Sequence, residues 1–406
     1  MRLYNTATRS VEELVVRDNT VSMYVCGVTP YDTTHTGHAF TYVTFDTLAR
    51  YLAHQGYEVR YVQNVTDIDD DILRRAAKVG IPWDVLGREQ TDRYLRDMAA
   101  LNVNTPELYV RATGEIPEMI AMIEALLERG YAYERNGSVY FRVSSDTEFG
   151  HVLTTMDYDA MLATANERGN YPDDPNKIDP LDFVLWQAAK PGEPSWESPW
   201  GPGRPGWHIE CSAMSLKYLG QQIDIHGGGS DLIFPHHSCE IVQSEHYTGI
   251  KPFVRFWVHT GMVHQDSEKM SKSLGNMTFV RDVLNEVHPD ALRLYLLDHH
   301  YRSVWEYRRE GPAERAALAA QLRAAVTAEC HGGQVLDVTP QRIRFFNSMD
   351  DDLWTPGAIA ACREVANAIY ATCHTGGSIS DAQATLREMA SILGLWLDMA
   401  PPLPSQ

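Results

Sequence analysis

The hydrophobic positions in the first third of the chain alternate between short apolar runs and stretches of helical spacing. The run at residues 21–25 is typical of a buried strand, residues 39–54 carry apolar side chains at helical intervals, and residues 57–65 form a second strand-like run. An acidic stretch at residues 66–71 then leads into a further helical pattern. Strands alternating with helices predict a parallel, doubly wound α/β sheet that binds ligands at the carboxyl ends of its strands.

The pattern changes beyond residue 115. A helical segment and a hairpin-like segment precede a Pro- and Trp-rich passage at residues 180–205, and the chain after residue 308 is helical and rich in Ala. We therefore expect a subdomain inserted in the sheet domain and a C-terminal helical bundle. The expected divisions are 1–115 and 197–247 for the two halves of the sheet domain, 116–196 for the connecting insertion, 248–308 for a region with a basic loop, and 309–406 for the bundle.

The composition is that of an ordinary globular protein with an acidic charge balance. The 406 residues are 44% hydrophobic and 22% charged, with a formal net charge of −19. An acidic total lowers the expectation of extensive contact with nucleic acid, which a basic face normally provides. There is no signal segment and no apolar run of membrane-spanning length, so we expect a cytoplasmic protein without membrane contact. The six scattered Cys favour reduced thiols or metal ligands over a disulfide framework.

The stretch C-G-V-T-P-Y-D-T-T-H-T-G-H at residues 26–38 joins the first expected strand to the first expected helix. Backbone N–H groups and the positive end of the helix dipole favour an anion at such a junction, and His35 and His38 add hydrogen-bond donors. The alternative is a strand–helix corner with incidental histidines. We interpret the stretch as a candidate phosphate site.

Four residues that are far apart in the chain carry side chains suitable for one metal ion: Cys26, Cys211, His236 and Glu240. His236 and Glu240 are four residues apart and would share a helical face. Two thiolates, an imidazole and a carboxylate are suitable zinc ligands. His237 and Cys239 could compete, but we expect their offsets to point them elsewhere. The alternative is a group of buried structural Cys with a satisfied His, because spacing alone does not pair ligands this far apart.

Two further segments indicate a nucleotide site. The loop K-M-S-K-S at residues 269–273 places Lys269 and Lys272 where they could clamp a polyphosphate as its charge develops. The alternative is a solvated basic loop. The glycine triplet at residues 227–229 would let the backbone approach a ligand closely, although such a triplet can also be an ordinary loop.

Other polar and aromatic residues near these motifs are weaker candidates. Trp207 could cover a small pocket or simply fill the core. Asp231 and the acidic run at residues 69–71 could bind an amino group. For the acidic run, capping of a helix is the preferred interpretation.

With these motifs the chain resembles the class I aminoacyl-tRNA synthetases. The family resemblance is carried by H-T-G-H at residues 35–38 and K-M-S-K-S at residues 269–273. Similarity to the cysteine-specific branch is carried by G-W-H-I-E-C at 206–211, G-G-G-S-D-L-I-F-P-H-H at 227–237, Cys26 and Glu240. The resemblance covers roughly residues 1–400. It implies a Rossmann-like catalytic domain that forms cysteinyl-adenylate from cysteine and ATP with Mg²⁺, and one zinc ion per chain that takes the substrate thiolate as a ligand.

The resemblance also implies a role for each candidate residue. The catalytic groups would be His35, His38, Lys269 and Lys272. ATP contacts would come from Gly27, Thr29, Gly37, Gly227, Gly228, Gly229, Asp231 and Val263. Substrate contacts would come from Thr41, Asn64, Thr66 and Trp207, and zinc would be held by Cys26, Cys211, His236 and Glu240. Thiolate coordination would separate cysteine from serine, which the shape of a pocket separates poorly.

Two members of this branch pass cysteine to different acceptors. One charges tRNA(Cys), and the other joins cysteine to the amine of glucosaminyl-inositol in mycothiol biosynthesis. T-P-Y-D-T-T-H at residues 29–35 and E-R-G-N-Y-P at residues 167–172 are similar to the sugar ligase, and the chain stops at Gln406, where the tRNA enzyme would continue into an anticodon-reading domain. The acidic balance also suits a small acceptor. We therefore expect the amino sugar as acceptor and favour a monomer.

Other features resemble the tRNA-charging enzyme and keep tRNA(Cys) as the alternative. Glu240 would be a fourth zinc ligand that the sugar ligase usually lacks, and His226, Leu274 and E-I-V-Q-S-E at residues 240–245 are also similar to the tRNA enzyme. A non-catalytic binding paralogue is a remote alternative, because both phosphate motifs and all four zinc candidates are present. The sequence suggests no role for Cys239, Cys330, Cys362 and Cys373.

Overall fold

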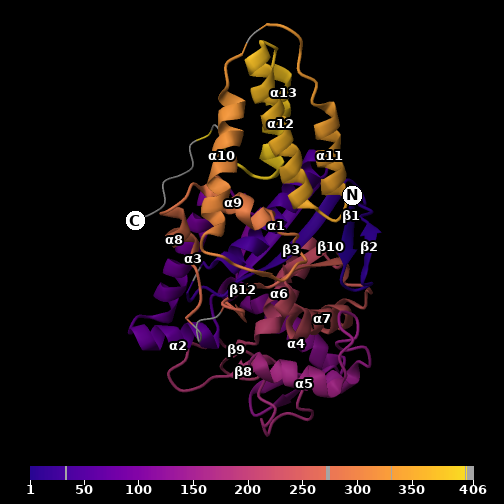
Figure 1. Ribbon diagram of the computed structural model, residues 1–406. Helices are drawn as coiled ribbons and strands as arrows, with labels where there is room; N and C mark the ends of the chain where they lie inside the picture. The colour runs from indigo at the N-terminus through magenta and orange to yellow at the C-terminus, as the bar shows by residue number, and fades with distance from the viewer. Residues whose placement is uncertain (33, 271–274, 331, 398, 400–406) are drawn as a thin grey trace.

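A parallel β-sheet forms the centre of the molecule (Figure 1). This computed structural model describes residues 1–32, 34–270, 275–330, 332–397 and 399. The strand order of the sheet is β11-β10-β3-β4-β5, and neighbouring strands are parallel. The strands are β3 (Thr20–Val28), β4 (Glu58–Val65), β5 (Leu108–Arg111), β10 (Ile223–Gly229) and β11 (Val254–Thr260). β3 precedes the other four in the chain but lies in the middle of the sheet. The chain therefore winds outward in both directions, which confirms the predicted doubly wound α/β fold.

Alternate residues of β3 enter two different hydrophobic cores. Val21, Met23 and Val25 belong to one core, while Tyr24 and Cys26 belong to the other, as the two-residue period of a strand requires. The first core includes residues of α1 (Thr36–His54), α3 (Trp83–Ala100) and α9 (Pro289–Leu297). The second includes residues of α4 (Ile116–Glu128), α6 (Trp207–Leu219) and α7 (Ser238–Thr248). Cys26 therefore faces α6 and α7.

Smaller elements surround the central sheet. An antiparallel sheet of order β6-β7-β8-β9 accompanies α5; these elements are β6 (Ala132–Arg135), β7 (Ser138–Phe141), α5 (Tyr158–Glu167), β8 (Phe183–Ala188) and β9 (Gly203–Pro205). The other short strands are β1 (Arg2–Asn5), β2 (Ser10–Glu13), β12 (Val263–Gln265), β13 (Glu268–Lys269) and β14 (Trp305–Glu306). Asp69 caps α2 (Asp70–Val79) by accepting from the Asp71 N–H at 2.7 Å, so the predicted capping role of the acidic run is confirmed.

Helices at the C-terminal end of the chain extend away from the sheet (Figure 1). They are α10 (Gly311–Thr327), α11 (Thr339–Asp350), α12 (Thr355–Thr375) and α13 (Ser380–Ile392), and the short α8 (Val280–Leu284) precedes α9. Their apolar residues continue the core that covers α1. A buried ion pair crosses this junction: Arg293 of α9 pairs with Asp46 of α1 and donates to Leu393 O at 2.5 Å and to Leu101 O at 2.7 Å.

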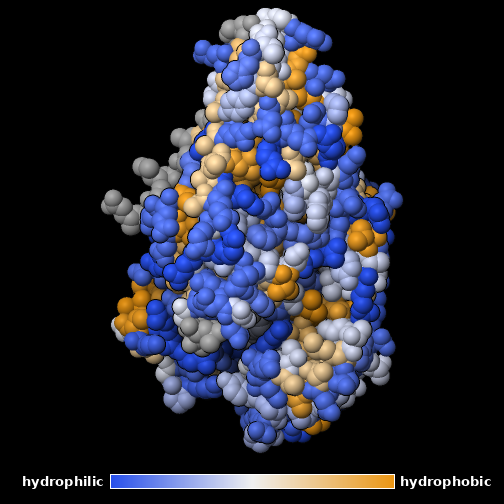
Figure 2. Space-filling model, viewed as in Figure 1, coloured by the Kyte–Doolittle hydropathy of each residue, from blue (hydrophilic) through white to orange (hydrophobic). Residues whose placement is uncertain are grey.

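The surface carries mainly polar side chains. Hydrophilic residues predominate on the face shown in Figure 2, and the hydrophobic residues visible there lie in separate small groups. Across the described ranges, no helix is both long and apolar enough to cross a membrane. Large apolar side chains such as Trp186, Trp257 and Phe45 are buried in the two cores.

Two cysteines contradict the expectation of reduced thiols or metal ligands. Cys330 and Cys373 form a disulfide, with their Cα atoms 5.4 Å apart and a sequence separation of 43. Cys330 follows α10 and Cys373 lies in the last turn of α12, so only the packing of these helices brings the sulfur atoms together. The cysteines described as free, which are all buried, are Cys26, Cys211, Cys239 and Cys362.

We expect the denatured, unreduced protein to be alkylated at the four free cysteines, and the reduced protein at all six. Intact-protein mass after iodoacetamide treatment with a chelator present would count the modified thiols. A variant with Cys330→Ser and Cys373→Ser is the control, because its count should not depend on reduction. Alkylation of all the native cysteines without reductant would contradict the disulfide.

Candidate active site

The metal-ligand candidate Cys26 lies at a β-bulge. The pairing register between β3 and β4 shifts between Val25 and Val28, and the Gly27 N–H donates to Oδ1 of Asn64 at 2.7 Å. A Cβ atom at Gly27 would lie 1.6 Å from the backbone oxygen of Asn64, so this approach requires glycine. Bulges redirect side chains beside functional sites. This one lies where Cys26 points toward α6 and α7.

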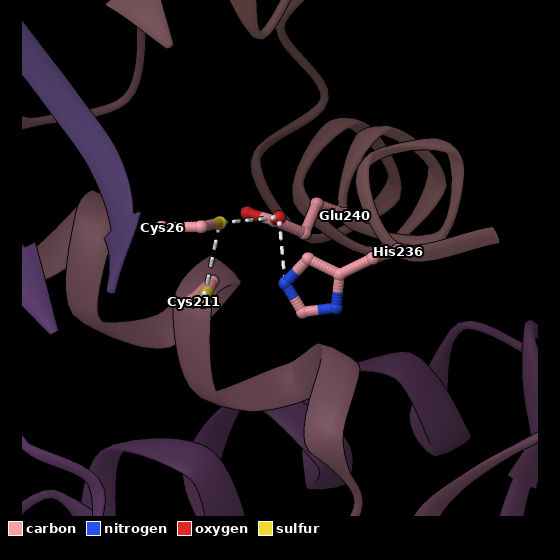
Figure 3. Close-up of side chains that lie close together, drawn as sticks. All are labelled: Cys26, Cys211, His236 and Glu240. Atoms are coloured by element: carbon pink, nitrogen blue, oxygen red, sulfur yellow. Dashed lines mark hydrogen bonds and ion pairs between the residues drawn. The ribbon is translucent and has the colours of Figure 1, made fainter. Parts of the chain in front are cut away.

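Four side chains converge from four elements of the fold (Figure 3). Cys26 comes from β3, Cys211 from α6, His236 from the turn η4 (Ile233–His237), and Glu240 from α7. The sulfur atoms of Cys26 and Cys211 are 3.6 Å apart, and Glu240 Oε1 lies 3.6 Å from Cys26 Sγ and 3.2 Å from His236 Nε2. All four side chains are buried, and one donor atom from each lies within 4.8 Å of the others. The structure thus brings together the four residues that we singled out as metal ligands.

The chemistry of this cluster fits a zinc ion. His236 Nε2 is buried and makes no hydrogen bond with good geometry in the described part of the chain, although Glu240 is near. Burial raises the pKa of the Cys26 and Cys211 thiols, so a cation between them is what would favour their thiolate forms. Two sulfur donors, one nitrogen and one oxygen form a suitable zinc ligand set.

His237 contradicts the expectation that it points elsewhere. Its Nε2 atom lies 3.3 Å from Cys26 Sγ. A second set of donors within 4.8 Å therefore exists, made by Cys26, His226, His237 and Glu240. Helical spacing fails here because Phe234 inside η4 is extended, with φ −139° and ψ 133°. The geometry leaves two overlapping donor sets that share Cys26 and Glu240.

Histidines behind the cluster orient its members. His208 Nδ1 lies 2.8 Å from His236 Nδ1, which leaves Nε2 of His236 directed at the cluster. His226 Nε2 lies 2.9 Å from Glu240 Oε2, which leaves Oε1 of Glu240 toward Cys26. Burial lowers the pKa of His208 to about 3 and lowers that of His236 as well. Both imidazoles are therefore neutral at physiological pH, which is the form that binds metal.

We expect Glu240→Gln to weaken metal binding at least about 10-fold, because a neutral amide replaces a carboxylate ligand in a buried site. Equilibrium competition with a chromophoric chelator would measure the affinity. Glu245→Gln is the matched control, since Glu245 is a buried carboxylate of the same helix that accepts from the Phe253 N–H instead. An unchanged affinity in Glu240→Gln would contradict a ligand role for Glu240.

The first phosphate motif lies at the N-terminus of α1. The His35 side chain caps this helix by accepting from the His38 N–H at 3.3 Å, and the two rings stack with centroids 3.7 Å apart. The Thr36 N–H donates to Thr278 O and the Val280 N–H donates to Thr34 O, both at 2.9 Å. The chain that follows the basic loop is therefore attached to this motif.

The basic loop itself lies only partly within the described residues. The backbone of Lys269 belongs to β13 and pairs with His264 of β12. The Lys269 side chain and residues 271–274, which include Lys272, lie outside the described part of the chain. Val263, a predicted nucleotide contact, is buried in β12.

The other predicted nucleotide and substrate residues lie near the same edge of the sheet. Gly227, Gly228 and Gly229 end β10, Asp231 follows them, Thr29 follows β3, and Gly37 and Thr41 belong to α1. A Cβ atom at Gly229 would lie 2.4 Å from Oδ1 of Asp231, so a side chain there would displace the aspartate. Thr41 Oγ1 lies 2.8 Å from Thr260 Oγ1, and the Trp207 ring stacks on His236 with centroids 4.1 Å apart. Trp207 thus covers the cluster from the side of α6.

Sequence reasoning did not assign several buried polar residues of this site. Glu210 accepts from Thr66 Oγ1 at 2.8 Å, and burial raises its pKa well above the ordinary value. His259 Nε2 lies 2.8 Å from Nδ1 of His237. One signal in the sequence could have indicated them: polar residues at positions 208, 210 and 259 stand within a largely buried helix and a buried strand.

Comparison with known proteins agrees with this site. A family model described as the class I (C) tRNA synthetase catalytic domain matches residues 12–316, and a DALR domain model matches residues 344–398. A cysteine–tRNA ligase of Dehalococcoides mccartyi is 46% identical over 410 residues, which cover 100% of this chain and 88% of that protein. A cysteine–tRNA ligase of Alkalilimnicola ehrlichii is 46% identical over 98% of this chain and 86% of its own length.

Another relative carries a different printed name. An L-cysteine:1D-myo-inositol 2-amino-2-deoxy-alpha-D-glucopyranoside ligase of Parafrankia is 44% identical over 100% of this chain and 90% of its own length. Among solved structures, Mycobacterium tuberculosis methionyl-tRNA synthetase in complex with methionyl-adenylate superposes with a TM-score of 0.66 and 16% identity, covering 92% of this chain and 89% of that chain. At this identity the likeness shows the fold alone.

Proposed function

Because the chain belongs to the class I tRNA synthetase family and is a cysteine-activating ligase, we propose that it transfers the activated cysteine to tRNA(Cys). The cysteine carboxylate would attack the α-phosphate of ATP, form cysteinyl-adenylate and release pyrophosphate. A hydroxyl at the 3′ end of the tRNA would then take the cysteinyl group and release AMP. No covalent bond to the protein is required in either step.

The chain's own residues would bind and orient ATP and stabilise the charge that develops on its phosphates. His35 and His38 stand at the N-terminus of α1, where helix N–H groups also favour an anion. Lys269 and Lys272 would approach the leaving pyrophosphate from the basic loop. Donors and cations placed in advance where charge develops are the largest common contribution to catalysis.

Selection of cysteine would take place at the buried cluster. Cys26, Cys211, His236 and Glu240 would hold zinc, which supplies a centre with a much higher affinity for a thiolate than for a hydroxyl. Trp207 stacks on His236 and would limit the access of water to the cluster. The hydroxyl of Thr66 and the amide of Asn64 are buried and hydrogen-bond to each other, and they would bind the polar end of the amino acid.

The position of Glu240 is the observation that carries the choice of acceptor. Its carboxylate lies within the donor cluster, and the sequence resemblance described above implies a fourth ligand at this position for the tRNA-charging branch. The cysteine–tRNA ligases of D. mccartyi and A. ehrlichii also align over nearly the whole chain. Our expectation of the amino sugar as main acceptor is therefore not confirmed, and tRNA(Cys) is better supported. The acidic total that favoured a small acceptor says nothing about local charge.

The amino-sugar acceptor remains the second candidate because of one specific observation. The Parafrankia ligase, which is named for that acceptor, is 44% identical over 100% of this chain. Its identity differs little from the 46% of the D. mccartyi cysteine–tRNA ligase. Overall similarity therefore does not separate the two, and a direct assay must.

The test offers both acceptors to the same activated enzyme. The purified protein would be incubated with ATP and labelled cysteine, and then with tRNA(Cys) transcript or glucosaminyl-inositol in parallel, with tRNA(Ser) transcript as control. We expect acid-precipitable label on tRNA(Cys) alone. Label on the amino sugar would overturn the proposed acceptor, and an enzyme without cysteine-dependent pyrophosphate exchange would overturn the activation step.

A further inference from the structure

Glu210 is a buried carboxyl to which the chemistry described above gives no role. It lies on α6 one residue before Cys211 and is 1% exposed. On a helix, positions 207, 210 and 211 share one face, which here is the face that carries Trp207 and Cys211. Burial of a carboxyl is unfavourable unless hydrogen bonds compensate it. Glu210 obtains one through Oε2, which accepts from Thr66 Oγ1 at 2.8 Å.

Three hydrogen bonds connect Gly27 to Glu210, and each has a defined donor. The Gly27 N–H can only donate, so the atom of Asn64 that lies 2.7 Å from it is the acceptor Oδ1. The Asn64 amide nitrogen then faces Thr66 Oγ1 at 3.2 Å and donates to it. The Thr66 hydroxyl in turn donates its proton to Oε2 of Glu210 at 2.8 Å. The donor order therefore runs from Gly27 through Asn64 and Thr66 to Glu210.

Among the described residues, these hydrogen bonds leave the Thr66 hydroxyl with one unused acceptor lone pair. A hydroxyl has one proton and two acceptor lone pairs, and the proton and one lone pair are already engaged. The remaining lone pair can only accept, and an ammonium group can only donate. Thr66 is also linked to both thiol ligands through the chain, because Gly27, which it reaches through Asn64, and Glu210 are the chain neighbours of Cys26 and Cys211. An α-ammonium group of an amino acid whose thiol occupies the cluster is the matching partner.

We propose that Glu210 is a positioning residue for the amino group of the substrate: it holds the Thr66 hydroxyl proton, so that Thr66 presents an acceptor to the α-ammonium group of cysteine. Thr66 touches the substrate, and Glu210 acts through Thr66. The inference deepens the proposed function at its first step. It rests on activation of cysteine by this chain and does not depend on which acceptor takes the cysteine.

The test compares two ligands that differ only at the amino group. Cysteine carries a thiol, a carboxylate and an ammonium group, whereas 3-mercaptopropionate lacks the ammonium. In Glu210→Leu we expect the KM for cysteine in pyrophosphate exchange to rise about 10–100-fold, as for a lost hydrogen bond to a charged group. The inhibition constant of 3-mercaptopropionate, the KM for ATP and the metal content should stay within about twofold, because Glu210 touches none of them.

Matched variants separate positioning from a merely structural role. Glu210→Gln keeps an acceptor for the Thr66 proton and should stay within about threefold of the native KM for cysteine. Thr66→Val should reproduce Glu210→Leu, while Thr66→Ser should not, and this pair tests the same hydroxyl if Glu210→Leu does not fold. Glu115→Leu is the control, because Glu115 is a buried carboxyl that contacts the far end of α6 through Lys217 and Tyr218.

Each result decides the proposal. It is supported if binding of cysteine is weakened and binding of 3-mercaptopropionate is not. The proposal is overturned if binding of both ligands is weakened equally or if the metal is lost. It is also overturned if the KM for cysteine is unchanged in folded Glu210→Leu and Thr66→Val. Native enzyme that exchanges pyrophosphate but does not charge tRNA would overturn only the proposed acceptor, whereas native enzyme without exchange would overturn both.

Discussion

Cys211→Ser is expected to remove metal binding and cysteine activation together. Cys211 is 1% exposed, and its sulfur lies 3.6 Å from that of Cys26, inside a cluster where a serine hydroxyl is a much poorer ligand. We expect the metal content to fall from about one ion per chain to less than about a tenth, and pyrophosphate exchange to fall at least about 100-fold. Elemental analysis after dialysis against a chelator, and the exchange assay at saturating ATP, would measure both.

Cys239→Ser is the matched control for that prediction. Cys239 is also a buried thiol and is the chain neighbour of Glu240, but it belongs to neither donor set among the described residues. Its variant should keep its metal and its exchange activity. If Cys211→Ser itself kept a full complement of metal, the set of Cys26, His226, His237 and Glu240 would be the site, and our assignment of Cys211 would be wrong.

Arg293→Met is expected to destabilise the protein by about 3 kcal/mol, the lower end of the usual cost of breaking a buried ion pair. The Arg293 guanidinium is 1% exposed and pairs with Asp46, which is equally buried. Its loss would strand two carbonyl groups and part of the charge of Asp46. Arg50 would remain 2.8 Å from that carboxylate, which is why the lower end is expected. Urea unfolding at neutral pH would measure the change.

An exposed ion pair of similar composition provides the control for Arg293. Arg342 contacts both oxygens of Glu388 at 2.8 Å on the surface of the helical bundle. Arg342→Met should cost less than about 1 kcal/mol, because exposed pairs are weakened by solvent. Equal losses of stability in the two variants would show that burial does not make the Arg293 pair more stabilising than an exposed pair. Such a result would contradict the role of Arg293 in joining the bundle to α1.

Local patterns predicted the framework of the fold correctly. The apolar run at 21–25 lies within β3, the periodic segment at 39–54 lies within α1, and the run at 57–65 covers β4. Such patterns succeed because strand and helix periods are set by residues close in the chain. The junction at His35 followed for the same reason, since a helix cap is formed by neighbouring residues. The expected domain divisions and the roles of individual site residues stay predictions.

Local patterns failed where distant segments meet. Helical spacing placed His237 away from the cluster, but the extended Phe234 in η4 turns it toward Cys26. The scattered cysteines suggested free thiols, but the packing of α12 against the end of α10 joins Cys330 to Cys373. In both cases the deciding contact lies outside the window in which periodicity carries information.

By itself, the sequence determined the alternation of strands and helices, the two candidate phosphate motifs and the chemical character of the candidate metal ligands. These depend on side-chain type and on spacing over a few residues. Only the tertiary structure decided which donors share one point in space, because Cys26 and Cys211 are 185 residues apart and Cys26 and Glu240 are 214 apart. It also decided the hydrogen-bond order from Gly27 to Glu210, since β3, the end of β4 and α6 must pack together before Gly27 contacts Asn64 and Thr66 contacts Glu210. Contacts of this range form only when burial of both cores brings the segments together, and no local pattern encodes them.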